Sequence, residues 1–508
     1  METKSLCPEC MAVVTADIIR EGDRMLIVKK CKDHGEFKDL YFSSSGTYDK
    51  FQKFEATGNG LSNPMTGQAK GCPHDCGICP NHRTQTLLAN IDLTNRCNLT
   101  CPTCFANARK NGYVYEPSLE QIKGMMQMLR DEKPVPCYAV QFAGGEPTLR
   151  EELPEILKMA RDMGFYQIMI ATNGVKLAQS KDYCRELKNT PLSTIYMQFD
   201  GVTEAPYVKL RGFNALPLKL KALQNMRETG LKNVVLVPTV VNGVNADQGG
   251  DIIRFALKNL DIVRGVNFQP VSFTGRVSND ELKAGRITIP DLLSRIEKQT
   301  DGQVRISDFY PVPSVSAISD MAEAWTNEPQ VKFTVHPHCG CATYLFMDRD
   351  EIVPITRFVD VDGLLACIKR TSNEYKGSKL AKILIAEKLL REVPRYVDHA
   401  GMPRDIDMVG ILREFVKGDI GRAIIHFHEK SIMVGAMHFM DPYNFDLERL
   451  RNCGIHYATP DGRVIPFCSY NIFYRNDIER RFEKAVGVET LKALELKKHA
   501  GITDSMEM

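Results

Sequence analysis

Most of the sixteen cysteines in this chain fall into groups whose spacing is typical of metal binding. Three groups are tight: Cys7/Cys10 with Cys31, Cys72/Cys76/Cys79, and Cys97/Cys101/Cys104. A looser group in the last third of the chain contains Cys339, Cys341, Cys367, Cys453 and Cys468. Cys137 and Cys184 stand alone, and we expect each to be a small buried hydrophobe. Because the N-terminus has no apolar export signal, the thiols are expected to stay reduced and to bind metal rather than form disulfides.

The strongest motif is Cys97-Asn-Leu-Thr-Cys101-Pro-Thr-Cys104, directly after a predicted strand. A cubane [4Fe–4S] cluster normally takes one thiolate per iron. Three cysteines within eight residues would bind three irons and leave the fourth open to a small molecule. Zinc is the alternative, but it needs a fourth ligand close by. We therefore predict that these cysteines hold a catalytic cluster with one open iron.

The other groups predict further metal sites. Cys72, Cys76 and Cys79 repeat the spacing without a preceding strand, which favours an auxiliary cluster with a distant fourth ligand. Cysteines of the C-terminal group supply that ligand and hold another cluster, so we predict two auxiliary [4Fe–4S] clusters, with the assignment of ligands left open. His82 is an alternative ligand. Cys7-Pro-Glu-Cys10 with Cys31-Lys-Asp-His34 predicts a small ribbon that holds one zinc or iron ion.

Apolar strand-like runs alternate with amphipathic helical stretches from about residue 88. One of these, 118–130, opens with an N-cap at Ser118 and has Gln121 three residues on, as in a capping box. Two further helices are predicted at 378–393 and 407–417. The predicted strands are 88–93, 138–142, 167–171, 194–199, 233–239 and 265–270. Six such units predict an α/β fold with a parallel sheet, either curled into a partial barrel or open. Polar residues gather where these strands end: Gly144-Gly145-Glu146, Asn173, Gln198, Asp200 and, with a weaker signal, Gln269. Since the C-terminal ends of parallel strands form the usual chemical face, we expect these residues near the cluster.

The pattern divides the chain into four parts. We predict an N-terminal metal ribbon (1–57), an auxiliary-cluster segment (58–87), the barrel (88–275) and a C-terminal α+β region with auxiliary-cluster ligands (276–508). The formal net charge of +2 supplies no broad field for nucleic acid. No window resembles a membrane span, and the expected location is the cytoplasm, with peripheral contact at the inner membrane face as an extension.

The cysteine loop and Gly144-Gly145-Glu146 together resemble the radical S-adenosylmethionine (SAM) enzymes. The resemblance implies that SAM binds the open iron of a cluster on Cys97, Cys101 and Cys104. It also implies contacts to SAM from Gly144, Gly145, Glu146, Asn173, Gln198 and Asp200, and a low-potential electron donor such as ferredoxin. A multi-cluster electron carrier is the non-enzymatic alternative, but a carrier is expected to use four protein ligands per cluster.

The order of ribbon, GCPxxCGxCP segment, barrel and a tail containing Cys468 resembles the archaeal tetraether lipid synthases. That resemblance implies an enzyme that couples the terminal methyl carbons of phytanyl chains in archaeal glycerophospholipids, forming macrocyclic archaeol and tetraether lipids. The alternative within the superfamily is methyl transfer to a pterin. It requires a second SAM or a methylated cysteine. Cys137, Cys184 or the surplus one of the two tail cysteines Cys339 and Cys341 is a candidate.

Overall fold

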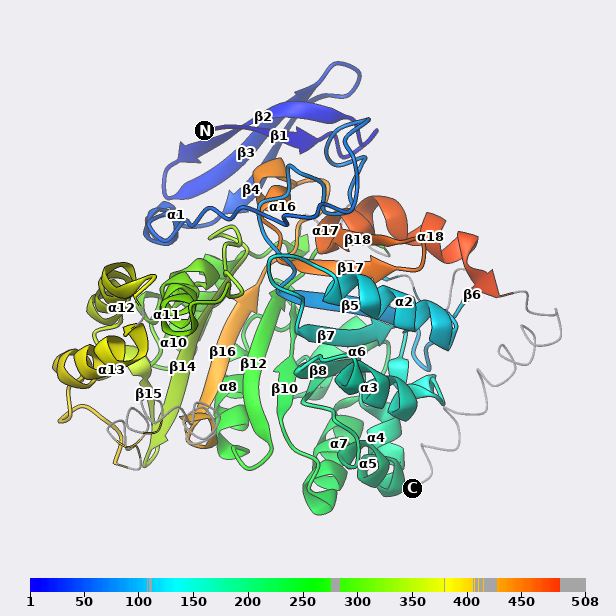
Figure 1. Cartoon of the computed structure of the whole chain (residues 1–508). Coiled ribbons are helices and arrows are strands. Elements are labelled where there is room, and N and C mark those ends of the chain that lie inside the picture. The colour runs from blue at the N-terminus through cyan, green and yellow to red at the C-terminus, as the bar shows by residue number, and fades with distance from the viewer. Residues whose placement is uncertain are drawn as a thin grey trace.

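A long twisted sheet runs through the middle of the computed structural model (Figure 1). The structure describes residues 1–106, 108, 112–275, 284–378, 380–404, 406, 410, 414 and 427–484. Within these residues the sheet has 13 strands, and its main path runs β13-β14-β16-β12-β10-β9-β8-β7-β5-β17-β18. The apolar side chains of the central strands form the main core together with the helices that flank them.

The six central strands are parallel and confirm the predicted series of β/α units. They are β5 (Leu88–Thr94), β7 (Ala139–Gly144), β8 (Gln167–Thr172), β9 (Thr194–Gln198), β10 (Val234–Val237) and β12 (Val263–Pro270). Their residues on the face that the helices cover, such as Ile91, Phe142 and Ile170, are fully buried. Parallel strands need crossover connections, which the intervening helices provide.

The crossover helices pack on one side of the curled sheet (Figure 1). They are α2 (Leu119–Arg130), α3 (Leu153–Asp162), α4 (Val175–Gln179), α5 (Lys181–Lys188), α6 (Glu204–Arg211), α7 (Leu216–Thr229) and α8 (Gly249–Lys258), with α10 (Ile289–Gln299) after them. The predicted capping box of α2 is present: the Ser118 hydroxyl accepts from the Gln121 backbone N–H, and the Gln121 side chain accepts from the Ser118 backbone N–H.

Residues from the C-terminal region extend this sheet at both edges. Strand β16 (Ser431–Met437) lies parallel to β12, and β17 (Ile455–Thr459) lies parallel to β5. The additional strands are antiparallel: β14 (Gly340–Asp348) on β16, β13 (Tyr310–Pro311) and β15 (Glu351–Pro354) on β14, and β18 (Arg463–Pro466) on β17. Residues far beyond 275 therefore complete the two walls of the barrel, which the alternation pattern alone did not indicate.

The chain also forms further helices and strands. They are β6 (Val114–Tyr115), β11 (Thr239–Val240), α11 (Ser316–Thr326), α12 (Val361–Tyr375), α13 (Ala381–Glu392), α16 (Leu447–Arg451), α17 (Phe467–Ser469), a π-helix (Tyr470–Tyr474), α18 (Arg475–Arg481) and β19 (Glu483–Lys484). Helix α13 confirms the helix predicted at 378–393, whereas the one predicted at 407–417 falls almost entirely outside the described residues. Among the described helices, none is both long and apolar enough to cross a membrane.

The first 52 residues form a four-stranded antiparallel ribbon followed by a short helix. Its elements are β1 (Glu2–Leu6), β2 (Val13–Glu21), β3 (Arg24–Cys31), β4 (Gly35–Phe42) and α1 (Ser45–Gln52). The ribbon packs on the loop between β16 and α16 (Figure 1). The buried Lys29 ammonium donates to the carbonyls of Pro442 and Tyr443, both at 2.7 Å, and Thr3 donates to Asp446 at 2.7 Å.

A buried hydrogen-bond chain joins the 58–87 segment to the barrel. The Thr86 hydroxyl donates to the Glu132 carboxyl at 2.5 Å and lies 3.0 Å from Nδ1 of His456 on β17. The second Glu132 oxygen has no partner among the described residues, and burial raises the pKa of Glu132 to about 8. A protonated carboxyl is therefore favoured in the folded protein, because burial disfavours the charged form.

Glu132→Gln should change the pH dependence of stability. The folded pKa is raised above the unfolded value of about 4.3, so the unfolded chain binds fewer protons between these values and wild-type stability falls as pH rises. We expect the unfolding free energy of the variant, relative to wild type, to increase by roughly 2–4 kcal/mol between pH 5 and pH 8. Urea denaturation at both pH values measures this. The exposed Glu151→Gln is the matched control, and an equal pH response in both variants would contradict the buried-carboxyl interpretation.

Candidate active site

A cavity of about 350 Å³ opens at the C-terminal ends of the parallel strands. Its walls come from three parts of the chain: the Cys97–Cys104 loop, the ends of the six central strands, and C-terminal residues around Phe439 and Phe467. The Phe439 and Phe467 rings stack with their centroids 3.9 Å apart, and Tyr457 lies against Phe467. The cavity therefore combines a cysteine loop, polar strand ends and an aromatic wall.

The three cysteines of the predicted catalytic cluster all line this cavity. Their loop follows β5, so the sheet fixes where it begins. The Leu99 backbone N–H donates to Cys97 Sγ at 3.4 Å, and burial raises the pKa of the Cys97 thiol far above its usual range. A bound metal would favour the thiolate that burial disfavours, because the thiolate is the form that ligates metal. The donor set thus fits an iron–sulfur cluster.

Gly144 and Gly145 line the cavity where β7 ends. A Cβ atom at either position would come within 2.2 Å of a backbone oxygen, that of Thr94 or that of Arg96. Gly144 also has a φ of 123°, which favours glycine. These glycines let β7 press against the chain that leads into the cysteine loop. The two glycines therefore position the cysteine loop, and they also expose backbone polar groups to a ligand.

The Glu146 carboxylate joins two strand ends. It accepts from the Thr148 and Thr172 hydroxyls at 2.6 and 2.7 Å and from the Asn173 backbone N–H at 2.7 Å. Glu146 is 1% exposed and lies behind the cavity lining, while Asn173 is part of that lining. The Glu146 carboxylate thus holds the ends of two strands together, and its contact with SAM stays a prediction.

Gln198 lines the cavity, whereas Asp200 lies behind it and pairs with Arg211. Arg211 donates from Nε and from a terminal nitrogen to the two Asp200 oxygens, both at 2.7 Å, and its own side chain lines the cavity. Lys219 is fully buried and donates to Gln198 Oε1 at 2.7 Å and to the Asn173 carbonyl. Burial lowers the pKa of Lys219 to about 8.

Arg211 and Lys219 are site residues that the sequence reasoning did not find. Each lies on a helix, α6 or α7, outside any motif. Asp200 and, to a smaller extent, the nearby Cys101 raise the pKa of Arg211, so a cation lies beside the cysteine loop. The only hint in the sequence is a basic residue in the last turn of the helix after Asp200. Its role appears only when that helix folds back over the strand ends.

Cys72, Cys76 and Cys79 lie on the segment before β5. Cys72 and Cys76 form a hydrogen bond with each other, which lowers the pKa of Cys72, and Cys76 is buried. The hydroxyl of Tyr474 in the π-helix donates to the Pro73 carbonyl at 2.6 Å and accepts from the Cys76 backbone N–H at 3.3 Å. The C-terminal part of the chain thus holds this segment in place.

The structure divides the five C-terminal cysteines. Burial raises the pKa of the Cys453 and Cys468 thiols, and the neighbouring thiols of this group, Cys339 included, raise both further. Arg449 donates to Cys339 Sγ at 3.4 Å. Cys468 also lines the central cavity and accepts from the Met440 backbone N–H at 3.3 Å. Cys341 instead lies in the main core on β14, and Cys367 is buried in α12. These two predicted ligands are thus placed apart from the other three.

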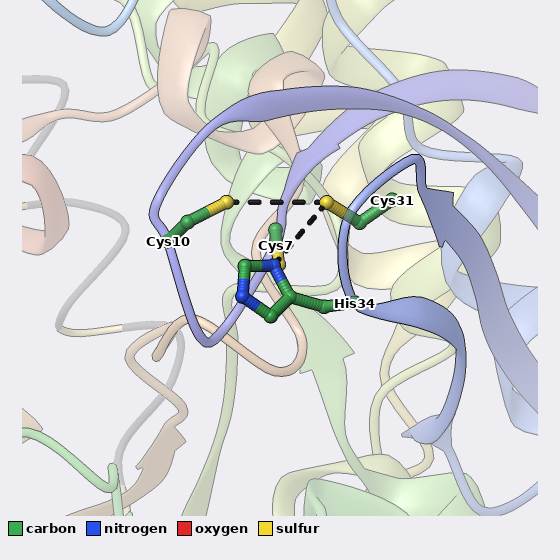
Figure 2. A group of neighbouring side chains, drawn as sticks. All are labelled: Cys7, Cys10, Cys31 and His34. Carbon is green, nitrogen blue, oxygen red and sulfur yellow. Dashed lines mark hydrogen bonds between the residues drawn. The ribbon is translucent and has the colours of Figure 1, made fainter.

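The predicted ribbon site is assembled in full. Its ligand atoms, from Cys7, Cys10, Cys31 and His34, all lie within 4.8 Å of one another. Figure 2 shows the four side chains pointing toward a common centre, from the loop after β1 and the turn between β3 and β4. Three thiols and one imidazole in this arrangement fit a tetrahedral zinc or iron ion.

Cys137 and Cys184 are fully buried in the main core, which confirms the expectation that each is a small buried hydrophobe.

Comparison with known proteins agrees with this geometry. Residues 91–256 match the Radical SAM superfamily, and residues 1–43 match the HMPTM N-terminal zinc ribbon domain. The chain is 49% identical over 485 residues to the 7,8-dihydro-6-hydroxymethylpterin dimethyltransferase of Methanocaldococcus jannaschii, with 95% of each chain covered. It is 24% identical over 226 residues to a GTP 3′,8-cyclase of Clostridium acetobutylicum, covering 44% of this chain and 65% of that protein.

Among solved structures, SAM-bound SuiB of Streptococcus suis has a TM-score of 0.35 and 17% identity, and the match covers 44% of this chain and 48% of SuiB. The fold and the matched regions define a radical SAM enzyme, an α/β partial barrel with an N-terminal metal ribbon. Such a domain implies a [4Fe–4S] cluster and SAM, and the ribbon indicates a metal site. By its identity over nearly its whole length, the chain belongs to the family of the M. jannaschii pterin dimethyltransferase.

This family assignment corrects the predicted resemblance to tetraether lipid synthases. The relative that matches the chain from ribbon to tail is a dimethyltransferase whose name specifies a pterin, and the ribbon matches the HMPTM ribbon domain. Coupling of phytanyl chains, glycerophospholipid substrates and membrane contact are therefore not supported. The order of ribbon, cysteine segments and barrel indicates which cofactors bind, but it does not indicate the substrate. The choice of substrate depends on the side chains that surround the cavity.

Proposed function

We propose that this protein is a radical SAM methyltransferase that acts on a reduced pterin. The observation that carries the proposal is the 49% identity with the M. jannaschii pterin dimethyltransferase over 95% of both chains. The reaction replaces a hydrogen on a pterin carbon with a methyl group, so each transfer adds a CH2 unit to the mass. SAM bound at an iron–sulfur cluster supplies a 5′-deoxyadenosyl radical, which can remove such a hydrogen atom.

The lining of the cavity supports a polar, planar substrate. Amide and phenol side chains from four strands, those of Asn90, Gln141, Tyr196 and Asn267, lie on its inner surface. The stacked rings of Phe439 and Phe467 form part of the opposite wall, and aromatic faces favour flat ring systems. A saturated lipid chain would offer no hydrogen bond to the Asn267 and Gln269 side-chain oxygens, which line the cavity and accept none from the described residues, and unpaired polar groups are costly in a buried site.

The metal sites are assigned within the same proposal. Cys97, Cys101 and Cys104 hold the SAM-binding cluster, and Gly144, Gly145, Asn173, Gln198 and Arg211 surround the bound SAM. Cys72, Cys76 and Cys79 hold one auxiliary cluster, and Cys339, Cys453 and Cys468 hold the other. The mutual proximity of each triad supports this assignment. We also propose the same four parts of the chain, 1–57, 58–87, 88–275 and 276–508. Strands β16 and β17 of the last part pair with the barrel.

The burial of three cysteines bears on the source of the methyl group. Cys137, Cys184 and Cys341 are each at most 2% exposed and lie in the main core, and burial raises the pKa of each thiol. A thiol carries a methyl group to a substrate only when it reaches the substrate. These residues are therefore poor methyl carriers, and the route we propose is direct donation from a second SAM. The pterin carbon radical takes the methyl group from the sulfonium, one electron from the low-potential reductant completes the step, and S-adenosylhomocysteine leaves.

The product mass tests the proposal. Anaerobically reconstituted enzyme, SAM, dithionite and 7,8-dihydro-6-hydroxymethylpterin should give a pterin heavier by one or two CH2 units. With methyl-deuterated SAM, the added group should carry the label. Enzyme without dithionite is the control, because cleavage of SAM requires an electron. Formation of 5′-deoxyadenosine with no change in the pterin would contradict the proposal, and an unlabelled methyl product would contradict SAM as the methyl source.

A further inference from the structure

Polar side chains line the cavity in two layers. The outer layer lies at the strand ends and includes Gln198 on β9 and Gln269 on β12. The inner layer lies two residues earlier on the same strands, at Tyr196 on β9 and Asn267 on β12. Residues two apart on a strand face the same side of the sheet, so both layers face the cavity.

A hydrogen-bonded triad joins the two layers. The Tyr196 oxygen accepts from Asn267 Nδ2 and, at 3.3 Å, from Gln269 Nε2. All three side chains line the cavity. Each amide thus directs one N–H to the phenol, and its second N–H and its carbonyl oxygen stay available to a ligand. Neither amide oxygen accepts a hydrogen bond from any residue that the structure describes.

The triad therefore presents a defined pattern of hydrogen-bonding groups. Tyr196 already accepts two N–H groups, and its own hydroxyl hydrogen has no acceptor within the described part of the chain. Burial raises the pKa of Tyr196 to about 12, so the phenol stays protonated and can donate. Two amide oxygens accept while one hydroxyl donates. Buried groups of this kind favour a ligand that completes their hydrogen bonds.

We propose that Tyr196, Asn267 and Gln269 form the subsite that recognises the amino-pyrimidinone edge of the substrate. That edge carries an amino group and a ring N–H, which donate, next to a carbonyl oxygen, which accepts. The two amide oxygens match the donors, and the Tyr196 hydroxyl matches the carbonyl. The inference rests on the proposed function, because it specifies how the pterin is bound and takes the class of substrate from the family.

A variant-by-analogue experiment tests this assignment. The variants are Asn267→Leu and Gln269→Leu, each of which removes an acceptor, and Tyr196→Phe, which removes the donor. The substrates are 7,8-dihydro-6-hydroxymethylpterin and its lumazine analogue, in which a carbonyl replaces the amino group. For all three variants we expect the KM for the pterin to rise about tenfold or more, with the KM for SAM unchanged.

The analogue separates the two roles. Wild-type enzyme should prefer the pterin by about tenfold or more, because lumazine leaves a buried acceptor unpaired. Of Asn267→Leu and Gln269→Leu, the variant that removes the acceptor of the amino group should largely lose that preference. Tyr196→Phe should keep it, since both substrates share the carbonyl. Tyr166→Phe and Gln167→Leu change exposed residues of the same kinds and should match wild type.

Each outcome has one meaning. If wild-type enzyme methylates the pterin but all three variants keep its KM and its preference, the triad does not bind the substrate and the proposed function stands. If the KM for SAM rises instead, the triad recognises the adenine of the cofactor and the inference is wrong. If wild-type enzyme does not methylate the pterin, the proposed function fails and the inference fails with it. Iron content equal to wild type shows that a variant is folded.

Discussion

Replacing Cys97, Cys101 and Cys104 together with alanine should abolish reductive cleavage of SAM, with 5′-deoxyadenosine falling to the detection limit. The three thiols share the wall of the cavity that Gly144, Asn173 and Gln198 also line. A cluster with only three protein ligands has an open iron for SAM, and the loss of those ligands removes the group that delivers the electron. Chromatographic measurement of 5′-deoxyadenosine after reaction with dithionite checks the prediction.

The same variant should keep its other metal sites. Cys72, Cys76 and Cys79 are held by Tyr474, and the ribbon ligands lie outside the cavity, so neither group depends on the Cys97 loop. Metal analysis should therefore show a loss of about four irons, one cubane's worth, from reconstituted protein. Replacing Cys72, Cys76 and Cys79 is the matched control. Should that control lose SAM cleavage while the Cys97 variant keeps it, the catalytic cluster would belong to the 58–87 segment.

Removing the Arg211 side chain should have the largest effect on stability. Arg211→Met leaves the Asp200 carboxylate, with 0% side-chain exposure, without its bidentate partner. Breaking a buried ion pair from one side costs about 3–5 kcal/mol. The Asp200 carboxylate would keep its hydrogen bonds from the Gln198 amide and the Thr239 backbone N–H but would lose its ion-pair partner. We expect a decrease of that size in the free energy of unfolding measured by urea denaturation. The affinity for SAM should also decrease, since Arg211 lines the cavity.

Two comparisons make this prediction specific. The double variant Arg211→Met/Asp200→Asn should be more stable than Arg211→Met, because it removes the uncompensated charge. Arg227→Met is the matched control: its ion pair with Asp261 is exposed by 41% and 52%, and such pairs contribute about 0–1 kcal/mol. Equal losses in Arg211→Met and Arg227→Met would show that burial of the Asp200 pair does not matter.

Much of the barrel could be predicted because its signals are local. The six central strands appear in the sequence as apolar runs, because parallel strands are buried on both faces. The capping box at Ser118 and the spacing of Cys97, Cys101 and Cys104 involve neighbours in the sequence. The ribbon ligands are nearly as local, because two short turns carry all four of them. Such features depend on chain geometry that a few residues determine.

The sequence by itself thus determined the cofactor chemistry, because cysteine spacing and strand order specify where a cluster and SAM can bind. The tertiary structure decided what surrounds them. It brought Arg211 to Asp200, separated Cys341 and Cys367 from Cys339, Cys453 and Cys468, and added β16 and β17 to the barrel. It also gathered Tyr196, Asn267 and Gln269 into one triad. These contacts join residues far apart in the chain, and their formation depends on how helices and strands pack, which no local pattern encodes.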